Sequence, residues 1–249
     1  MKKVLLHSRI IMLLMVFIVF LISTLIYISC YKTDFCYRAL AKCGFRDYSI
    51  SESRHRIENR CLEGWYNTLL KMDVQADLVF YGNSITYESD FQRCFPEKRV
   101  LNLGCNRDDL DDLINRSFII KSVRPKKIFV LGGINGLMDI TLKDFESNYR
   151  ILVDTIINQN PSSAIFLQSI LPVNPGMELG ARYVDCLDKI KYANAIIRNI
   201  AFKRKCVYVD LYSSYQKNDS LPRIYTKDGV HLTTDAYQIW AAIIKRYVE

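Results

Sequence analysis

Asp228 and His231, near the C-terminus, have the residue types and the spacing of an acid–base pair. The chain contains three histidines, and the other two, His7 and His55, lie near its N-terminus. Asp228 precedes His231 by three residues, with Gly229 between them, so the carboxylate can turn back to the imidazole. Such a carboxylate fixes the imidazole tautomer and stabilises the imidazolium ion. His231 is therefore the candidate general base.

Ser84 is the candidate nucleophile because it follows Gly82 and Asn83 at the end of an apolar run. A strand-to-helix turn there would expose its hydroxyl at a helix N-terminus, where the dipole favours developing negative charge. Taken alone, a serine at a helix start is more often an N-cap. Thr86 stands where a G-x-S-x-G motif has its second glycine, so the turn is not the nucleophile elbow of α/β-hydrolases.

Gly104 and Asn135 could donate hydrogen bonds to the oxyanion that forms when a serine attacks an ester. A glycine N–H can approach that oxygen closely, and an asparagine amide supplies another donor. Gly104 directly follows an apolar run, and Asn135 lies within Gly-Gly-Ile-Asn-Gly at 132–136. Each is ordinarily a turn residue. Their joint occurrence with Ser84 and His231 favours the catalytic interpretation.

Five short apolar runs must position these groups. They lie at 78–81, 100–103, 128–131, 164–167 and 207–209. Longer amphipathic stretches, typical of helices, lie around 108–121, 143–158, 185–203 and 234–248. This alternation predicts a parallel sheet covered by helices on both faces. Sites in such sheets form at the carboxyl ends of the strands, where the candidate residues lie.

The N-terminus carries an uncharged apolar run at 10–28, preceded by Lys2, Lys3 and Arg9. About 19 residues at a rise of roughly 1.5 Å span the bilayer core, so we expect one transmembrane helix within 1–30, acting as a signal anchor. The sequence at 25–30 also loosely matches a lipoprotein cleavage site, which leaves lipidation of Cys30 as an alternative.

The rest of the chain divides into a juxtamembrane linker at 31–54 and a folded domain at 55–249, which opens with an amphipathic helix from Ile57. A short N-terminal tail normally stays in the cytoplasm, so we expect the catalytic domain on the extracytoplasmic side of the membrane.

Composition argues against two classes of function. The formal net charge is +8, but the basic residues are interleaved with acids and form no basic helix, so we expect no nucleic-acid partner. The charge suits an anionic membrane surface better. The eight cysteines include no CxxC and no Cys/His cluster, so we expect no metal site. Cys36, Cys43 and Cys61 could form one disulfide, whereas Cys105 and Cys206 suit buried apolar positions.

Four segments resemble, in the correct order, the four sequence blocks of the SGNH (GDSL-type) hydrolases. These segments are 82–86, Gly104, 133–135 and 228–231, and the resemblance covers about residues 76–249. It implies a flavodoxin-like three-layer α/β/α sandwich with a five-stranded parallel sheet, here preceded by the transmembrane helix. Asn83 and Gly136 depart from the family pattern, since each stands where an aspartate is usual.

The resemblance also implies roles for individual residues. Ser84 would be the nucleophile and His231 the base, with Asp228 behind it. The N–H groups of Ser84 and Gly104 and the side chain of Asn135 would form the oxyanion hole. No metal or organic cofactor would take part.

The implied function is a serine esterase that hydrolyses O-acetyl or short acyl esters, as small molecules or on glycans, through an acyl-enzyme. Three alternatives stay open: a membrane-anchored O-acyltransferase that modifies an envelope polysaccharide, a lysophospholipase or thioesterase, and a non-enzymatic binding module. A nucleotide-binding domain is disfavoured because the chain has neither G-x-G-x-x-G nor a P-loop. The oligomeric state is not predicted.

Overall fold

The computed structural model describes residues 74–249, together with positions 15, 23, 68, 69 and 71. The predicted anchor, the linker, the helix from Ile57 and the cysteines proposed for a disulfide lie outside the described residues, apart from those isolated positions. No helix within the described part is long and apolar enough to cross a membrane.

Five parallel strands form one sheet in the order β2-β1-β3-β4-β5. They are β1 (Leu78–Gly82), β2 (Val100–Gly104), β3 (Lys127–Leu131), β4 (Ala164–Gln168) and β5 (Val207–Val209). Each strand matches one predicted apolar run to within one residue at either end. The strand order is that of flavodoxin-like doubly wound folds, in which ligands bind where the order reverses, beside the first strand.

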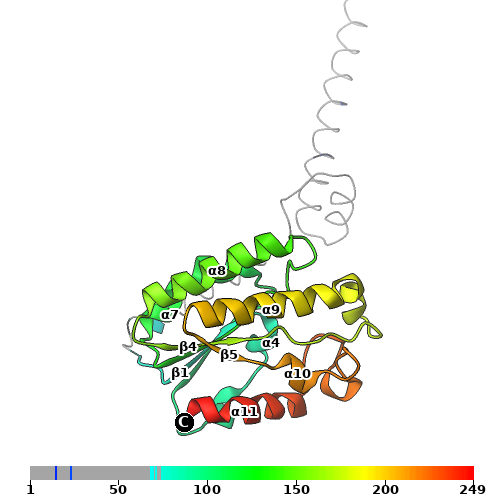
Figure 1. Cartoon of the computed structure of the whole chain (residues 1–249). Helices are drawn as coiled ribbons and strands as arrows, with labels where there is room; N and C mark the ends of the chain where they lie inside the picture. Colours follow the sequence, from blue (N-terminus) through cyan, green and yellow to red (C-terminus); the bar gives the residue numbers. More distant parts are fainter. Residues whose placement is uncertain (1–14, 16–22, 24–67, 70, 72–73) are drawn as a thin grey trace, which may run out of the picture. The chain divides into compact units, whose positions relative to one another are not determined.

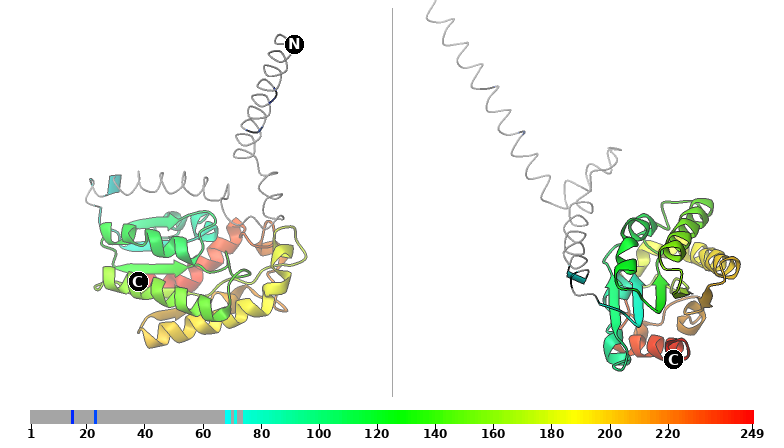
Figure 2. Two further views of the ribbon diagram at one scale, coloured as in Figure 1. Left: turned by 90° about the horizontal axis from the view of Figure 1, so that it is seen from above. Right: turned by 90° about the vertical axis from the view of Figure 1, so that its left-hand side faces the viewer.

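Helices cover both faces of this sheet, as predicted. They are α4 (Ser84–Tyr87), α5 (Phe91–Cys94), α6 (Leu110–Arg116), α7 (Phe118–Ser122), α8 (Leu142–Gln159), α9 (Leu187–Lys203), α10 (Tyr212–Tyr215) and α11 (Thr234–Val248), with short 3₁₀ helices η1 (Gly180–Cys186) and η2 (Arg223–Tyr225). Helices α8 and α9 lie on one face and α11 on the other, which gives three layers (Figures 1 and 2).

The stretch expected as one helix at 108–121 is instead two, α6 and α7, which meet at Ser117. The N–H of Ser117 donates to Ile114 three residues earlier, a 3₁₀-type bond that tightens the end of α6 and interrupts the α-helical ladder.

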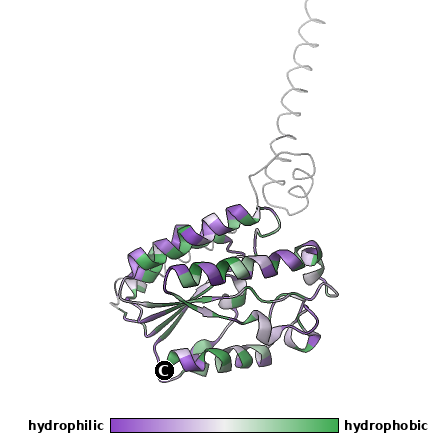
Figure 3. Ribbon diagram, in the orientation of Figure 1, coloured by the Kyte–Doolittle hydropathy of each residue, from purple (hydrophilic) through white to green (hydrophobic). Residues whose placement is uncertain are grey.

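The helices bury one side and expose the other. In α8 the buried residues are Phe145, Tyr149, Leu152, Val153 and Ile156, a spacing that forms one stripe towards the sheet. Most of the remaining positions of that helix are hydrophilic (Figure 3), although Ile151 is exposed.

A row of phenylalanines crosses the sheet. Phe80, Phe129 and Phe166 stand in register on β1, β3 and β4, with ring centroids 5.0 and 4.5 Å apart. Trp240 of α11 donates a hydrogen bond to the Gln168 side chain at 2.7 Å and so joins α11 to the end of β4. This packing gives the strand ends a rigid base.

Candidate active site

Ser84 lies at the junction between β1 and α4, and a neighbouring residue caps that helix. Oδ1 of Asn83 accepts the N–H of Ile85 at 3.1 Å, so Asn83 is the N-cap and Ser84 is the first helical residue. The alternative that Ser84 is a helix cap is therefore wrong. Its Oγ instead lies 2.9 Å from Nε2 of His231, 147 residues away in the sequence.

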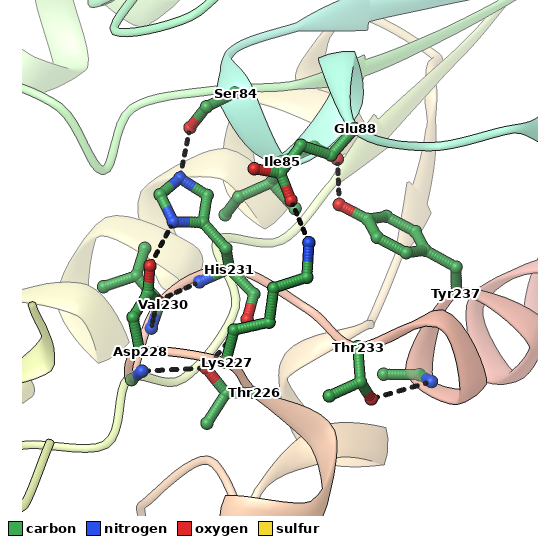
Figure 4. Close-up of polar contacts among 12 residues, drawn as sticks. Ser84, Ile85, Glu88, Thr226, Lys227, Asp228, Val230, His231, Thr233 and Tyr237 are labelled. Atoms are coloured by element: carbon green, nitrogen blue, oxygen red, sulfur yellow. Dashed lines mark hydrogen bonds and ion pairs between the residues drawn. The ribbon is translucent and has the colours of Figure 1, made fainter.

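His231 and Asp228 complete a continuous line of hydrogen bonds with Ser84 (Figure 4). Nδ1 of His231 lies 2.7 Å from Oδ2 of Asp228. The other carboxylate oxygen accepts the N–H groups of Val230 and His231, both at 2.9 Å. The predicted turn of the carboxylate back to the ring is thus present, with Gly229 in the left-handed region at φ 100°.

The electrostatics of Asp228 suit a charged partner for histidine. Burial raises the pKa of this carboxyl, but the hydrogen bonds from the His231 ring and from the two backbone N–H groups outweigh burial, and the net pKa is lowered. Asp228 is therefore ionised at neutral pH. The His231 side chain keeps 20% of its surface exposed, so a substrate can reach the imidazole.

Sequence reasoning missed Thr226, which closes the loop that carries Asp228 and His231. Its hydroxyl donates to the His231 carbonyl at 2.8 Å and accepts the Gly229 N–H at 2.9 Å. The N–H of Lys227 adds a bond to the same His231 carbonyl at 3.0 Å. These bonds hold the loop before α11 begins.

Two further contacts join that C-terminal region to α4, the helix that begins at Ser84 (Figure 4). Lys227 pairs with Glu88, the C-cap residue of α4, with Nζ and Oε2 2.9 Å apart. The hydroxyl of Tyr237, on α11, donates to the carbonyl of Ile85 at 2.7 Å. Ser84 and His231 are thus positioned by direct contacts between their own elements.

Gly104 does not hold the position that the sequence suggested. Its N–H donates to Oδ1 of Asn102 at 2.9 Å and is occupied. A Cβ at this glycine would lie 2.2 Å from the backbone nitrogen of Tyr87. The Gly104 N–H is therefore already bonded within the structure, and the absence of a side chain here lets the backbone of α4 pack closely against β2.

Asn135 lies in the loop after β3, between Gly133 at φ 109° and Gly136 at φ 73°. Its Nδ2 donates one hydrogen bond to the carbonyl of Asp108 at 2.9 Å. An amide nitrogen has two N–H groups, so one remains for another acceptor. Gly136 departs from the family pattern for a visible reason, since an aspartate would be strained at its left-handed φ.

The loop after β2 contains free backbone amides that sequence reasoning missed. Within the described residues, the N–H groups of Asn106 and Arg107 have no acceptor. Arg107 is left-handed at φ 67°, and consecutive N–H groups around such a residue can form an anion-binding concavity. The next residue, Asp108, is the one whose carbonyl binds Asn135. These amides therefore replace Gly104 as candidate donors.

The described part of the chain contains no group of three or more His, Cys, Asp or Glu side chains that could hold a metal ion. Of the predicted site residues, the structure brings together Ser84, His231 and Asp228. The side chain of Asn135, from the loop after β3, is hydrogen-bonded to the loop that follows β2.

Comparisons with known proteins identify the family and agree with the fold. The model of the GDSL-like lipase/acylhydrolase family matches residues 79–239. A GDSL-like lipase from Bacteroides thetaiotaomicron has a TM-score of 0.65 at 23% identity, covering 74% of this chain and 96% of its own. A catalytic mutant of an acetylxylan esterase from Geobacillus stearothermophilus has a TM-score of 0.56 at 16% identity, covering 70% and 94%. A lipase/acylhydrolase from Enterococcus faecalis has a TM-score of 0.55 at 20% identity, covering 69% of this chain and 94% of its own. No curated protein sequence matches the chain.

Proposed function

The chain belongs to the GDSL-like lipase/acylhydrolase family, whose members hydrolyse ester bonds, and we propose that Ser84, His231 and Asp228 are its catalytic triad. The observation that supports this proposal is the continuous line of contacts among the three side chains. Oγ of Ser84 lies 2.9 Å from Nε2 of His231, and Nδ1 of His231 lies 2.7 Å from Oδ2 of Asp228. In this arrangement a histidine removes the serine proton while a carboxylate stabilises the imidazolium. The family match agrees with the resemblance seen in the sequence blocks.

The proposed reaction has two steps. Nε2 of His231 accepts the Ser84 hydroxyl proton as Oγ attacks the ester carbonyl carbon, and the protonated imidazole then gives this proton to the leaving alcohol. The acyl group is now bonded to Oγ. Water attacks the acyl-enzyme with His231 again as base, and the acid leaves as Ser84 recovers its proton.

The proposed oxyanion hole differs from the one expected from the sequence. The Ser84 N–H has no acceptor within the described residues, as befits the first residue of a helix. The second N–H of the Asn135 amide and the free amides of Asn106 and Arg107 complete the set. Removing one such donor costs on the order of 3 kcal/mol of transition-state stabilisation.

The substrate that we propose is an O-acetyl or other short acyl ester carried by a carbohydrate. The acetylxylan esterase among the structural neighbours supports this choice by analogy of fold. We also propose that residues 1–30 tether the domain to a membrane, with the active site outside the cytoplasm. The apolar run at 10–28 and the net charge of +8 support the tether, and the short N-terminal tail supports the side of the membrane.

A substrate panel tests the reaction and its specificity. Wild-type protein and Ser84→Ala would be assayed on acetylated sugars and on p-nitrophenyl esters of increasing acyl length. We expect hydrolysis by the wild type, fastest with acetyl esters, and only background turnover by the folded variant. Wild-type rates in Ser84→Ala would contradict the assigned nucleophile.

The same assays separate the alternatives. Faster turnover of long acyl esters or thioesters would replace the carbohydrate esterase with a lysophospholipase or thioesterase. Transfer of labelled acetyl groups to a polysaccharide, with negligible free acetate, would identify an acyltransferase in which a sugar hydroxyl takes the place of water.

A further inference from the structure

Arg116, the last residue of α6, is a buried cation beside the active site. Only 5% of its surface is exposed, and its partner Asp108 is completely buried. Moving a charged pair out of water costs free energy that the mutual attraction often does not recover. Stability is therefore a poor reason for the pair, and its contacts suggest a geometric one.

The guanidinium of Arg116 holds three separate acceptors. Nε donates to the carboxylate of Asp108, Nη1 to the carbonyl of Leu103 at 2.8 Å, and Nη2 to the carbonyl of Gly82 at 2.8 Å. The ring of Tyr81 lies 4.3 Å from Cζ and covers the face of the group. Each of the three guanidinium nitrogens thus donates a hydrogen bond, and the three acceptors fix the orientation of the group.

The three acceptors belong to the segments that carry the proposed oxyanion donors. Gly82 ends β1, two residues before Ser84, and Leu103 lies near the end of β2. Asp108 follows the free amides of the 105–109 loop, and its carbonyl binds the side chain of Asn135. One side chain therefore connects the nucleophile turn, the 105–109 loop and, through Asp108, Asn135.

We propose that Arg116 is a positioning residue for the oxyanion hole, setting the 105–109 loop and Asn135 at the correct distance from Ser84. The inference rests on the proposed esterase function. Arginine is required because its fork reaches three acceptors at fixed angles, whereas the single ammonium of lysine cannot. Arg116 touches no reacting atom and acts only through the groups that it holds.

The test compares wild-type protein with Arg116→Lys on p-nitrophenyl acetate, at temperatures where both are folded by circular dichroism. A displaced oxyanion hole weakens transition-state binding alone, so kcat should fall on the order of 100-fold while KM stays within about 3-fold. Arg204→Lys is the control, since Arg204 pairs with Asp154 and, as the C-cap residue of α9, precedes the start of β5, at the sheet edge opposite the strand ends that carry the site. It should keep wild-type kinetics.

A double variant asks whether Arg116 acts through Asn135. If it does, adding Asn135→Ala to Arg116→Lys should lower kcat by much less than the product of the two single effects. Multiplied effects would overturn the inference, as would a folded Arg116→Lys with kcat within about 3-fold of wild type.

Asp108→Asn serves if Arg116→Lys does not fold, because asparagine keeps the shape of the side chain but removes its charge and replaces one acceptor oxygen with an NH2 donor. It should show the same fall in kcat at constant KM, and unchanged kcat would again overturn the inference. An inactive wild-type protein would count against the esterase function itself, whereas an active wild type with active variants would count only against the role of Arg116.

Discussion

Gly180 contacts the turn at 228–231, which carries Asp228 and His231, so closely that adding one methyl group should displace this turn. The carbonyl of Asp228 accepts the N–H groups of Leu179 and Gly180 at 3.0 and 3.1 Å, and the carbonyl of Gly229 accepts that of Asn174 at 2.8 Å. Three backbone bonds thus join the loop after β4 to the turn that carries the proposed Asp228–His231 pair.

The expected effect of Gly180→Ala follows from two distances. The new Cβ would lie 1.9 Å from the Asn174 carbonyl oxygen, against 3.4 Å for an ordinary contact, a shortfall of about 1.5 Å. It would also lie 3.1 Å from Cα of Gly229. Both neighbours are backbone atoms, so either the loop after β4 or the turn at 228–231 must move. A misplacement of about 1 Å can cost on the order of 100-fold in rate, and overpacking costs about 1–3 kcal/mol of unfolding free energy.

The assay measures kcat/KM for p-nitrophenyl acetate and the urea unfolding of Gly180→Ala. Gly176→Ala is the matched control between β4 and α9, because its Cβ would meet only side-chain atoms, Oδ1 of Asn174 at 3.2 Å and Nη2 of Arg223 at 3.8 Å, and no backbone atom. We expect about a 100-fold loss for Gly180→Ala and less than about 3-fold for Gly176→Ala. Equal activity of the two folded variants would refute the reasoning.

Three further predictions concern the same elements. The folded-state pKa of Asp228 lies below its ordinary value of 3.8, so its ionised form stabilises the fold above that pH, and the benefit is lost as the pH falls through the lowered pKa. Urea unfolding should show a larger unfolding free energy for wild type than for Asp228→Asn at neutral pH, and this difference should shrink in acid. A difference that grows in acid would contradict the lowered pKa. Asn83→Ala should lower the unfolding free energy by about 1 kcal/mol, whereas Asn83→Asp should keep the cap, and equal losses would contradict this. Tyr237→Phe should cost about 1–3 kcal/mol in the same assay, because the buried carbonyl of Ile85 loses its donor, and an unchanged midpoint would show that the bond contributes nothing.

The sheet and the triad geometry were predictable from sequence because both depend on local patterns. Short apolar runs marked all five strands, and a glycine follows each of the first three. The parallel order then brought the residues after β1 to one edge, and a spacing of three residues let Asp228 reach His231. The hydroxyl of Ser84 was free because Asn83 took the capping position, which the sequence left open.

The oxyanion hole was harder to predict because its geometry depends on tertiary contacts. A glycine after a strand can present its N–H to a ligand or let another backbone approach, and only the contact with Tyr87 shows which applies at Gly104. Arg107 gave no signal, since arginine is not a residue type associated with left-handed backbone. Nothing in the amphipathic stretch at 108–121 marked Arg116 as a buried residue, yet the fold buries it.

The most direct test of the central proposal is to find where an acyl-enzyme forms. Wild-type protein, Ser84→Ala and His231→Ala would be treated with a fluorophosphonate probe and analysed by peptide mass spectrometry. We predict one adduct, on the peptide containing Ser84, in the wild type, a much slower reaction in His231→Ala, and none in Ser84→Ala. Labelling of a different serine, or equal labelling of wild type and Ser84→Ala, would contradict Ser84 as the nucleophile.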